Sequence, residues 1–508
     1  MSEPRAPRAH HTGRAVARTP ILAVVVAALV AGGLIDRVSA SSGASSGPAG
    51  QPVPVAAPIG AMSSSWFCAG ATDVRKTLGD APGAVIVANS GLAPVPVVVS
   101  LIPSQGASRK IAMTVPAESG RVIDEAVPGG TPWIGAIVDV DGGGVVVEQA
   151  IIGRYGRSAT PCATSGSQDW YFASGATLVN AGVELSLLNP YPVDSVVDLS
   201  FTTDQGQESP QGFQGLVVPA GGMLNVNLGD HLRRRQWIAT TVAARTGRIV
   251  AWKTDWVHPP QTGAVIEGTK AAENPLADPA APVPGSTVTL GASSAGTSWT
   301  WADGLTETGF SESYVVYNPS PVPAEVRLAL TLDQGVAEPF PLSVGPGQVT
   351  TITSGAEARI PAGVRHSAVL TSVNGVPVVA ERLLTVDAPH ESGVAELLGG
   401  RMAASRWLLA GAHADRTHQG VVVLYNPGDA PVSVAINGLN GSSAPLVSVG
   451  RVIVPAGRRV SVLINRGTQV VAEPLLVDAS GQVYAEQDLY GANGATGVSL
   501  SFGVPLTP

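Results

Sequence analysis

The sequence has little charge, few aromatic residues and almost no cysteine. Of its 508 residues, 13 % are charged and 5 % are aromatic, whereas globular proteins contain about 25 % charged residues. This shortage excludes a coiled coil and a long helical bundle, whose exposed faces carry many charges. A net charge of −8 also excludes a nucleic-acid-binding protein, because such binding depends on clustered lysine and arginine.

The two cysteines, Cys68 and Cys162, lie in no Cys-x-x-Cys or Cys/His spacing. A zinc site and a redox dithiol are therefore not indicated. The sequence also lacks a P-loop, a dinucleotide fingerprint and a Ser-His-Asp set. We therefore expect a protein that is not an enzyme and that carries no cofactor.

Glycine and proline, 60 and 41 residues, are abundant instead, and the hydrophobic fraction of 44 % argues against bulk disorder. The first 40 residues hold five basic and two acidic residues, so the remaining 25 basic and 36 acidic residues give the body a charge of −11.

The N-terminus has the pattern of an export signal. Basic residues precede an uncharged run at residues 21–35, and Val38-Ser39-Ala40 forms a small-x-small site. Residues 1–40 are therefore either a signal peptide cleaved after Ala40 or an uncleaved membrane anchor. As a helix the run would span about 23 Å, less than the roughly 30 Å of a hydrocarbon core. Both alternatives place the body outside the cytoplasm, secreted, wall-facing or anchored in the membrane.

Residues 41–62 are rich in Ser, Gly and Pro and predict a linker. In an oxidising compartment an isolated cysteine pair favours a disulfide between Cys68 and Cys162, which would close a loop of about 95 residues. Two separate buried thiols are the alternative.

Four anchors recur in order through the body. The first anchor is a tryptophan segment, and the second is an apolar run that ends in Asn. This Asn lies nineteen residues after a Trp in three copies. In the first copy the distance is twenty-three residues, because of an insertion around Lys76. A Pro between small residues follows 27 to 30 residues after each Asn, and a hairpin ends 59 to 63 residues after it. The anchors chosen as core residues are Trp66, Trp170, Trp301, Trp407, Asn89, Asn189, Asn318 and Asn426.

Within each copy the apolar residues alternate as in half-buried strands, and Asn-Pro marks turns. About seven short strands in 85–100 residues predict an immunoglobulin-like β-sandwich. The fold class is thus all-β, with four tandem sandwich units after an N-terminal hydrophobic helix. We place the units at residues 63–164, 165–260, 295–387 and 403–508, with linkers at 261–294 and 388–402.

The units form either an extended array or a closed arrangement. Residues 497–506 read as an extra C-terminal strand that could pair backwards and close the set. The recurrent tryptophans are interpreted as core residues between two sheets. A platform on which glycans stack is the alternative.

The repeated motifs resemble a known pattern. Residues 169–177, DWYFASGAT, and residues 378–382, VVAER, match a W-Y-F-A-x-G-x-T … N-P … V-P-A … V-V-A-E repeat in exported actinobacterial proteins of an uncharacterised family, a domain of unknown function. The resemblance covers residues 63–490, although copy one has Asn-Ser and copy two ends in Trp252. It implies export and tandem β-rich modules but no activity.

Other chemical candidates favour structural interpretations. His413, Asp415 and His418 form the one local histidine cluster, in a loop, and Asp139 and Asp141 start like a calcium loop without its later ligands. The repeated glutamates are expected to bond within their own units, and the basic run to be a solvated loop. These two sets are Glu148, Glu381 and Glu486, and Arg233, Arg234 and Arg235.

These features predict a non-catalytic cell-envelope protein that acts as a scaffold or binding module for an envelope protein or a cell-wall polymer. If residues 21–35 are not cleaved, they also bind the membrane. The alternative is an accessory protein or enzyme of cell-wall glycan assembly with a site between units. Acids converging across a unit boundary would favour that alternative, and four separately packed units would favour a scaffold.

Overall fold

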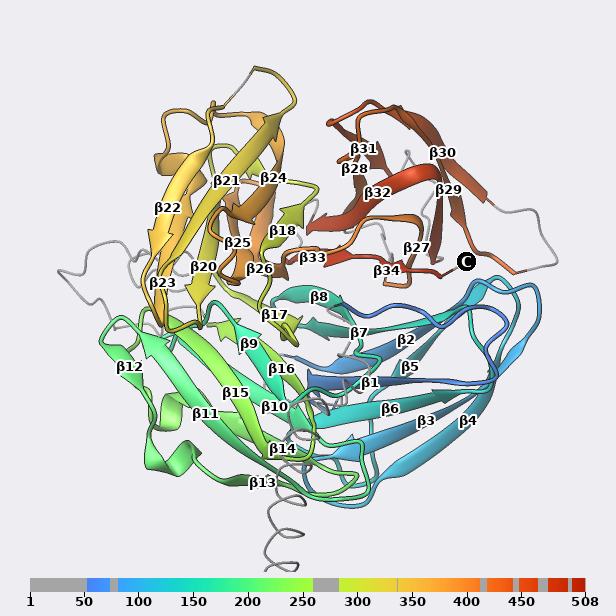
Figure 1. Cartoon of the computed structure of the whole chain (residues 1–508). Coiled ribbons are helices and arrows are strands. Elements are labelled where there is room, and N and C mark those ends of the chain that lie inside the picture. The colour runs from blue at the N-terminus through green and yellow to red at the C-terminus, as the bar shows by residue number, and fades with distance from the viewer. Residues whose placement is uncertain are drawn as a thin grey trace, which may run out of the picture. The chain divides into compact units, whose positions relative to one another are not determined.

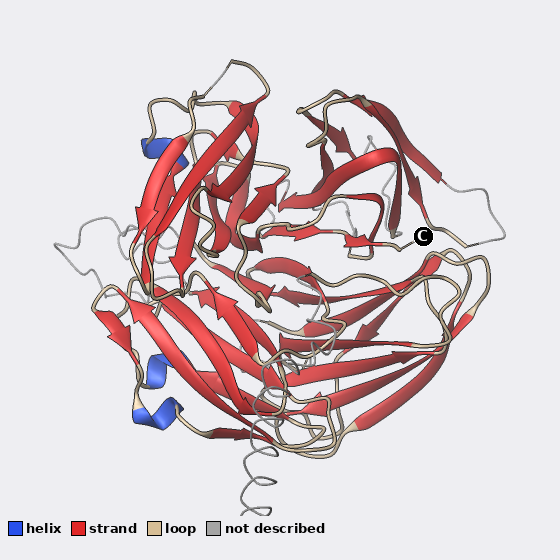
Figure 2. Cartoon of the chain, viewed as in Figure 1, coloured by secondary structure: helices blue, strands red, loops and turns tan. Residues whose placement is uncertain are grey.

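The computed structural model is all-β, as the alternation of apolar residues predicts (Figure 2). The chain divides into residues 1–49 and a compact unit of residues 50–508. The residues described are 53–73, 81–258, 283–335, 337–411, 418–441, 447–464, 474–491 and 496–507. The predicted signal or anchor and the insertion near Lys76 lie outside these ranges. Across the described ranges, no helix is long and apolar enough to span a membrane.

The strands fall into four successive groups, named modules 1 to 4 (Figure 1). Module 1 contains β1 (Ser64–Ala71), β2 (Gly83–Asn89), β3 (Val95–Pro103), β4 (Arg109–Val115), β5 (Ser119–Asp124), β6 (Ile134–Val140), β7 (Val145–Gly153) and β8 (Gly156–Pro161). Module 2 contains β9 (Asp169–Phe172), β10 (Ala181–Leu188), β11 (Ser195–Thr203), β12 (Gly206–Glu208), β13 (Leu216–Val218), β14 (Met223–Asn227), β15 (Ile238–Thr246), β16 (Val250–Val257) and β17 (Gly285–Leu290).

Modules 3 and 4 repeat this succession. Module 3 contains β18 (Ser298–Trp301), β19 (Leu305–Thr306), β20 (Phe310–Asn318), β21 (Ala324–Leu332), β22 (Phe340–Val344), β23 (Gln348–Thr353), β24 (Val364–Ser372), β25 (Val379–Ala388) and β26 (Glu391–Leu398). Module 4 contains β27 (Ala404–Leu409), β28 (His418–Tyr425), β29 (Val432–Gly438), β30 (Val447–Val454), β31 (Arg459–Leu463), β32 (Leu475–Gly491), β33 (Val498–Phe502) and β34 (Val504–Pro505).

Each module has two antiparallel sheets with one strand order. The first sheets run β1-β6-β3-β4, β9-β15-β11-β12, β18-β24-β21-β22 and β27-β32-β29-β30. The second sheets run β5-β2-β7-β8, β14-β10-β16-β17, β23-β20-β25-β26 and β31-β28-β32-β33, the long β32 serving both sheets of module 4. The recurring sequence anchors thus mark a recurring strand order, while the immunoglobulin-like assignment remains a prediction.

The last strand of each second sheet lies at the centre of the compact unit (Figure 1). These inner strands are β8, β17, β26 and β33, and each contacts the next, with β33 returning to β8. The modules therefore form a closed arrangement rather than an extended array. Two inner strands, β17 and β26, lie in segments that we interpreted as linkers, 261–294 and 388–402. Small residues are typical of linkers, but they are also needed where four strands pack closely together.

Glycines allow the inner strands to meet backbone to backbone. Glycines occupy equivalent positions at or near the start of each inner strand, the last directly before β33: Gly156, Gly285, Gly393 and Gly497. A Cβ on Gly156 would collide with the Cα of Gly497, and one on Gly393 would lie 2.8 Å from the backbone nitrogen of Val498. Gly156, Gly393 and Gly497 also have positive φ, which other residues rarely adopt.

The hydrophobic core continues from module to module. One buried cluster joins modules 1 and 2 and includes Leu408 and Val504 of module 4. A second cluster in module 3 includes Ala173 of module 2 and Leu500 of module 4. The modules are therefore not separately packed.

Cys68 and Cys162 form a disulfide, as predicted. It joins β1 of module 1 to the residue that follows inner strand β8. Cys68 lies two residues after Trp66, and in module 3 Trp301 lies two residues after Trp299. Trp301 Nε1 donates to the carbonyl of Leu397 on β26 at 3.1 Å. This position thus attaches the first sheet to the inner strand, covalently in one module and by packing and a hydrogen bond in another.

Candidate functional site

The anchor tryptophans are core residues. Trp66, Trp170, Trp301 and Trp407 are each at most 3 % exposed. Equivalent indole Nε1 atoms donate to carbonyls on the hairpin: Trp170 to Ile249, Trp299 to Val378 and Trp407 to Val483, at 2.8, 2.9 and 3.0 Å. By this bond Trp299, not Trp301, is the module 3 equivalent of the other anchors. Such burial leaves no indole face on which a glycan could stack.

The anchor asparagines tie two turns of their module together. Asn189 Nδ2 donates to the carbonyls of Val193 and Val218 at 2.8 and 3.1 Å, while its Oδ1 accepts the Tyr191 N–H. Asn89, Asn318 and Asn426 make the same set of bonds. This geometry explains the constant spacing between the Asn and the Pro anchors.

The repeated glutamates bond across module boundaries, which corrects the expectation that they bond within their own units. Glu148 of module 1 accepts the N–H groups of Ala410 and Gly411 of module 4, at 2.8 and 2.7 Å. Glu486 of module 4 accepts those of Ala302 and Asp303 in module 3, at 2.7 and 3.2 Å. The sequence could not show this, because the closed arrangement brings each glutamate to the tryptophan segment of the preceding module, and Glu148 of module 1 to that of module 4.

Glu381 of module 3 has the same place at the boundary with module 2. It accepts the Ala173 N–H at 3.0 Å and the Ser174 hydroxyl. Module 2 itself has Trp252 at this position and meets module 1 through apolar packing, with Thr254 Oγ1 donating to the Gly70 carbonyl at 2.5 Å. One boundary thus replaces the carboxylate by an indole.

A buried lysine gathers three acids at the boundary of modules 2 and 3. Lys253 Nζ lies 2.7 Å from Glu396, 3.4 Å from Asp255 and 3.5 Å from Glu381. Burial, and then repulsion from Glu396, hold the pKa of Asp255 well above its usual range. Burial lowers the pKa of Lys253, but the three acids more than reverse this, so Lys253 stays charged.

A larger ion network fills the boundary of modules 3 and 4. Arg382 is fully buried and bonds Glu312 and Glu486, both at 2.7 Å. His366 Nε2 lies 3.0 Å from Glu312. Asp303 pairs with Arg365, and also with Arg459 of module 4.

Two of the boundary carboxyls have pKa values well above the usual range. Burial raises the pKa of Glu148 to about 7 against two backbone N–H bonds, and that of Glu486 to about 7 against the charge of Arg382. Groups with such pKa values are candidates for proton transfer. The side chains of Glu381, Glu396 and Glu486 are fully buried, however, so a substrate would reach them only if the modules separated.

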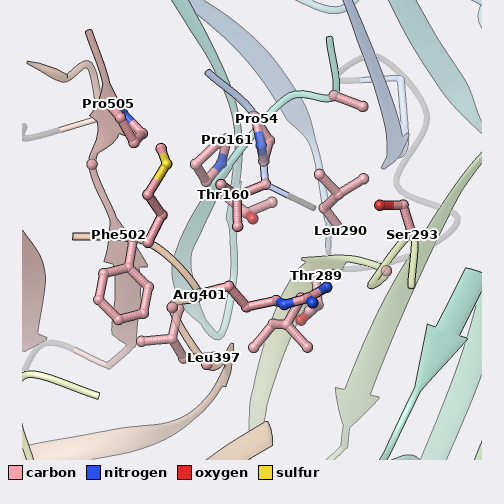
Figure 3. A pocket seen from close by; sticks show the side chains of 18 of the residues that line it. Pro54, Thr160, Pro161, Thr289, Leu290, Ser293, Leu397, Arg401, Phe502 and Pro505 are labelled. Carbon is pink, nitrogen blue, oxygen red and sulfur yellow. The ribbon is translucent and has the colours of Figure 1, made fainter. Parts of the chain in front are cut away.

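A pocket opens at the centre of the compact unit, with a volume of about 100 Å³. Equivalent residues of the four inner strands line it: Pro161, Leu290, Leu398 and Phe502. Figure 3 shows Pro54, Pro161 and Phe502 facing the same space, with Arg401 extending across it. We call this feature the central pocket.

Arg401 is the cation of the central pocket. Its Nη1 donates to the carbonyl and the hydroxyl of Ser294 at 3.0 and 2.8 Å, and its guanidinium carbon lies 5.1 Å from the Trp299 ring centre. None of the ion pairs found among the described residues involves Arg401, and burial lowers its pKa. The neighbouring Thr289 has a buried hydroxyl without a hydrogen-bond partner in the described part of the chain.

The sequence interpretation missed the central pocket, although a fifth repeated motif marks it. The four inner strands read GRSATPC, GSTVTLG, GVAELLG and GVSLSFG, beginning at Gly156, Gly285, Gly393 and Gly497. Each has a glycine five residues before an apolar residue that is itself followed by Cys or Gly. The spacing from the glutamate position to this motif varies too much for the motif to stand out.

The remaining sequence candidates lie elsewhere. Asp139 is on β6 and accepts a hydrogen bond from the Ser65 hydroxyl at 2.8 Å. No cluster of His, Cys, Asp and Glu side chains that could hold a metal ion occurs among the described residues. Arg233 and Arg234 are exposed, while Arg235 pairs with Glu208 at 2.8 Å. His413 and Asp415 lie outside the described ranges, and His418 begins β28.

Three comparisons with known proteins give little about activity. A family model described as a family of unknown function (DUF5719) matches residues 144–381, slightly under half of the chain. No curated protein matches. A solved alpha-L-rhamnosidase of Streptomyces avermitilis, complexed with L-rhamnose, aligns at 9 % identity and a TM-score of 0.11, over 79 % of this chain and 54 % of the enzyme. The chain thus spans about half the length of that enzyme, and so low a TM-score carries no argument.

Proposed function

We propose that this chain is an exported, non-catalytic binding protein of the cell envelope whose binding site is the central pocket. The observation that carries the proposal is how the pocket is built: each of the four modules contributes one equivalent residue to its lining. Pockets with apolar walls and a few polar groups are the usual form of ligand sites. The four immunoglobulin-like units would then be a rigid frame for this site.

The position of the charged side chains supports binding rather than catalysis. The acids at the boundaries of modules 2 and 3 and of modules 3 and 4 are paired with Lys253 and Arg382 and lie away from solvent. Paired and buried charges of this kind hold one arrangement of the modules in place. The disulfide and the signal-like residues 1–40 support export, because disulfides persist in oxidising compartments.

The proposal is tested by filling the pocket. The tagged full chain and its Thr160→Trp variant are incubated with envelope extract and with purified wall polymer, and the bound material is identified by mass spectrometry. Thr160 lines the pocket and is half-buried, so an indole there should displace a ligand. Val217→Trp adds the same bulk at an exposed position on β13 and is the control.

We expect the bound material to disappear with Thr160→Trp and to remain with Val217→Trp. Leu398→Trp provides a second pocket variant if Thr160→Trp does not fold. Identical bound material for the wild type and both pocket variants would contradict the proposal. The export arm is tested by N-terminal sequencing of the cell-associated protein. A start at Ser41 would identify a cleaved signal, and an intact N-terminus in the membrane fraction an anchor.

An enzyme of cell-wall glycan assembly is the second candidate, because acids do converge across a module boundary. Asp255, Glu381 and Glu396 come from two modules and surround Lys253. If this set were catalytic, Glu396→Gln would abolish the release of sugar reducing ends from wall glycan while the protein stays folded. No release by the wild-type chain would remove this candidate.

A further inference from the structure

We propose that the central pocket binds the carboxyl terminus of a peptide whose last side chain is apolar. This inference rests on the proposed function and names its ligand class. It follows from four features of the pocket: its size, its closed end, its single cation and the extended chain at its mouth.

The size of the pocket fits one side chain. Its volume of about 100 Å³ lies below the roughly 300–1,000 Å³ of sites for drug-sized ligands. An apolar cavity of about 150 Å³ holds a benzene molecule. An apolar side chain therefore fits the space between Leu290, Leu398 and Phe502, and a sugar ring with its hydroxyl groups does not suit these walls.

The inner end of the pocket is closed. Five residues along the inner strands from the lining residues, about 16 Å away, the backbones meet at the glycine positions. A Cβ on Gly285 would lie 2.9 Å from the nitrogen of Val394, and one on Gly393 would lie 3.0 Å from the Cα of Gly497. A long acyl chain cannot pass between these backbones, and the volume of about 100 Å³ limits the ligand to a short group.

The charge of the pocket suits one carboxylate. Arg401 lines the pocket and forms no ion pair with an acid among the described residues, where the Thr289 hydroxyl lacks a partner as well. Glu396 also lines the pocket, but its charge is already paired with Lys253 at 2.7 Å. A guanidinium binds a carboxylate through two parallel hydrogen bonds. Phosphate groups are generally recognised by clusters of arginines, which this pocket does not contain.

The mouth of the pocket already accommodates extended chain. Val53 and Pro54 line it, and Ala56 pairs in parallel with Leu506. The Ala56 N–H donates to the Pro505 carbonyl at 3.0 Å. An extended peptide therefore fits beside these residues, with its last side chain inserted and its terminal carboxylate on Arg401.

The test measures the binding of small probes to the full chain by isothermal titration calorimetry. The probes are N-acetyl-Ala-Ala-Leu as the free acid, the same peptide as its C-terminal amide, N-acetyl-Ala-Ala-Ser as the acid, and 4-methylpentanoate. Arg401→Gln removes the charge. Arg406→Gln is the matched control, because Arg406 is a partly exposed arginine five residues away whose partner is Asp478.

We expect the Leu acid to bind about ten- to a hundredfold more tightly than the amide, which is the usual effect of a charge-assisted bond. Arg401→Gln should remove that difference and Arg406→Gln should preserve it. Equal binding of acid and amide, a preference that survives Arg401→Gln, tighter binding of the Ser acid, or tighter binding of 4-methylpentanoate would each overturn the inference. If no probe binds while Thr160→Trp still removes an envelope ligand, the ligand class is wrong and the proposed function stands.

Discussion

One repeated sequence position is charged at one module boundary and apolar at another. These are the boundary between modules 3 and 4 and the boundary between modules 1 and 2. At the first, Glu486 accepts two backbone N–H groups of module 3 and pairs with the buried Arg382. At the second, the equivalent residue is Trp252, which is fully buried and packs close to Gly70. One fold thus joins its modules by a desolvated ion network in one place and by an indole in another.

The difference shows what a buried charge adds to a boundary. Desolvation consumes much of the attraction between buried ions, so an apolar boundary can be as stable as an ionic one. Removing one partner of a buried ion pair, by contrast, strongly destabilises the fold, because the remaining charge stays buried and unpaired. The ionic boundary should therefore be sensitive to pH and to single substitutions, and the apolar boundary only to lost volume.

Breaking the ionic boundary should have the largest effect. Arg382→Met leaves Glu312 and Glu486 without their cation, and losing one partner of a buried pair costs about 3–5 kcal/mol. Loss of the arginine also raises the pKa of Glu486 further above about 7, so the variant should recover stability as the pH falls from 8 to 5. Urea unfolding followed by tryptophan fluorescence at both pH values measures this.

Arg245→Met is the control for that experiment. Arg245 pairs with Asp198 at 2.6 Å, but its side chain is 54 % exposed, and solvent screens such surface pairs so that they add little to stability. Equal losses from the buried and the exposed arginine would contradict the proposed role of the ion network.

Truncating the apolar boundary should have the next largest effect, without the pH dependence. Trp252→Ala empties the space of a fully buried indole and should cost about 3–5 kcal/mol. No acid is left unpaired, so the loss should be the same at pH 5 and pH 8. Trp407→Ala, at a buried indole whose hydrophobic cluster consists of module 4 residues, gives the scale for a tryptophan outside a boundary. A loss from Trp252→Ala that shrinks at pH 5 would remove the distinction between the two boundaries.

The sequence predicted the parts of the fold that depend on local pattern. Alternating apolar residues identified the strands, and the Asn and Trp spacings identified four copies, because both reflect contacts within one module. Trp299 and Asn318 make those contacts over a fixed number of residues. The disulfide was predictable because Cys68 and Cys162 are the two cysteines of a sequence that starts with a signal-like segment.

The central pocket and the boundaries were not predictable, because they depend on how the modules meet. Residues 285–290 and 391–398 lie in segments that the sequence pattern predicts to be linkers, yet they form inner strands. Glu148 bonds residues that lie more than 260 positions away, and no sequence period reveals that pairing. Arg401 lies in the segment 388–402, which the sequence pattern predicts to be a linker.

Removing the disulfide should have a somewhat smaller effect than the boundary substitutions. The Cys68–Cys162 bond has a sequence separation of 94 residues, and replacing both cysteines by alanine should cost about 2–5 kcal/mol through loop entropy. Module 3 has Trp301 in place of the bonded cysteine, so its stability should not change. Hydrogen exchange, read separately for β1 and β18, distinguishes this local loss from a general one. Two free thiols in the unreduced native protein would contradict the bond itself.

The smallest expected effect concerns Glu148, which closes module 1 onto module 4 without a cation. Its pKa in the folded chain is about 7, above the ordinary value of 4.5, so its contribution is complete below pH 4.5 and is lost as the pH rises through 7. Gln at this position does not titrate. Between pH 5 and pH 8 the free energy of unfolding of Glu148→Gln should therefore rise by about 2–3 kcal/mol relative to that of the wild type. Denaturant midpoints of both proteins across that range measure the gain. A difference in midpoint between the two proteins that stays constant with pH would mean that Glu148 is already ionised in the closed arrangement. The boundary of modules 4 and 1 would then stabilise a buried charge without a cation, whereas the boundary of modules 3 and 4 uses Arg382.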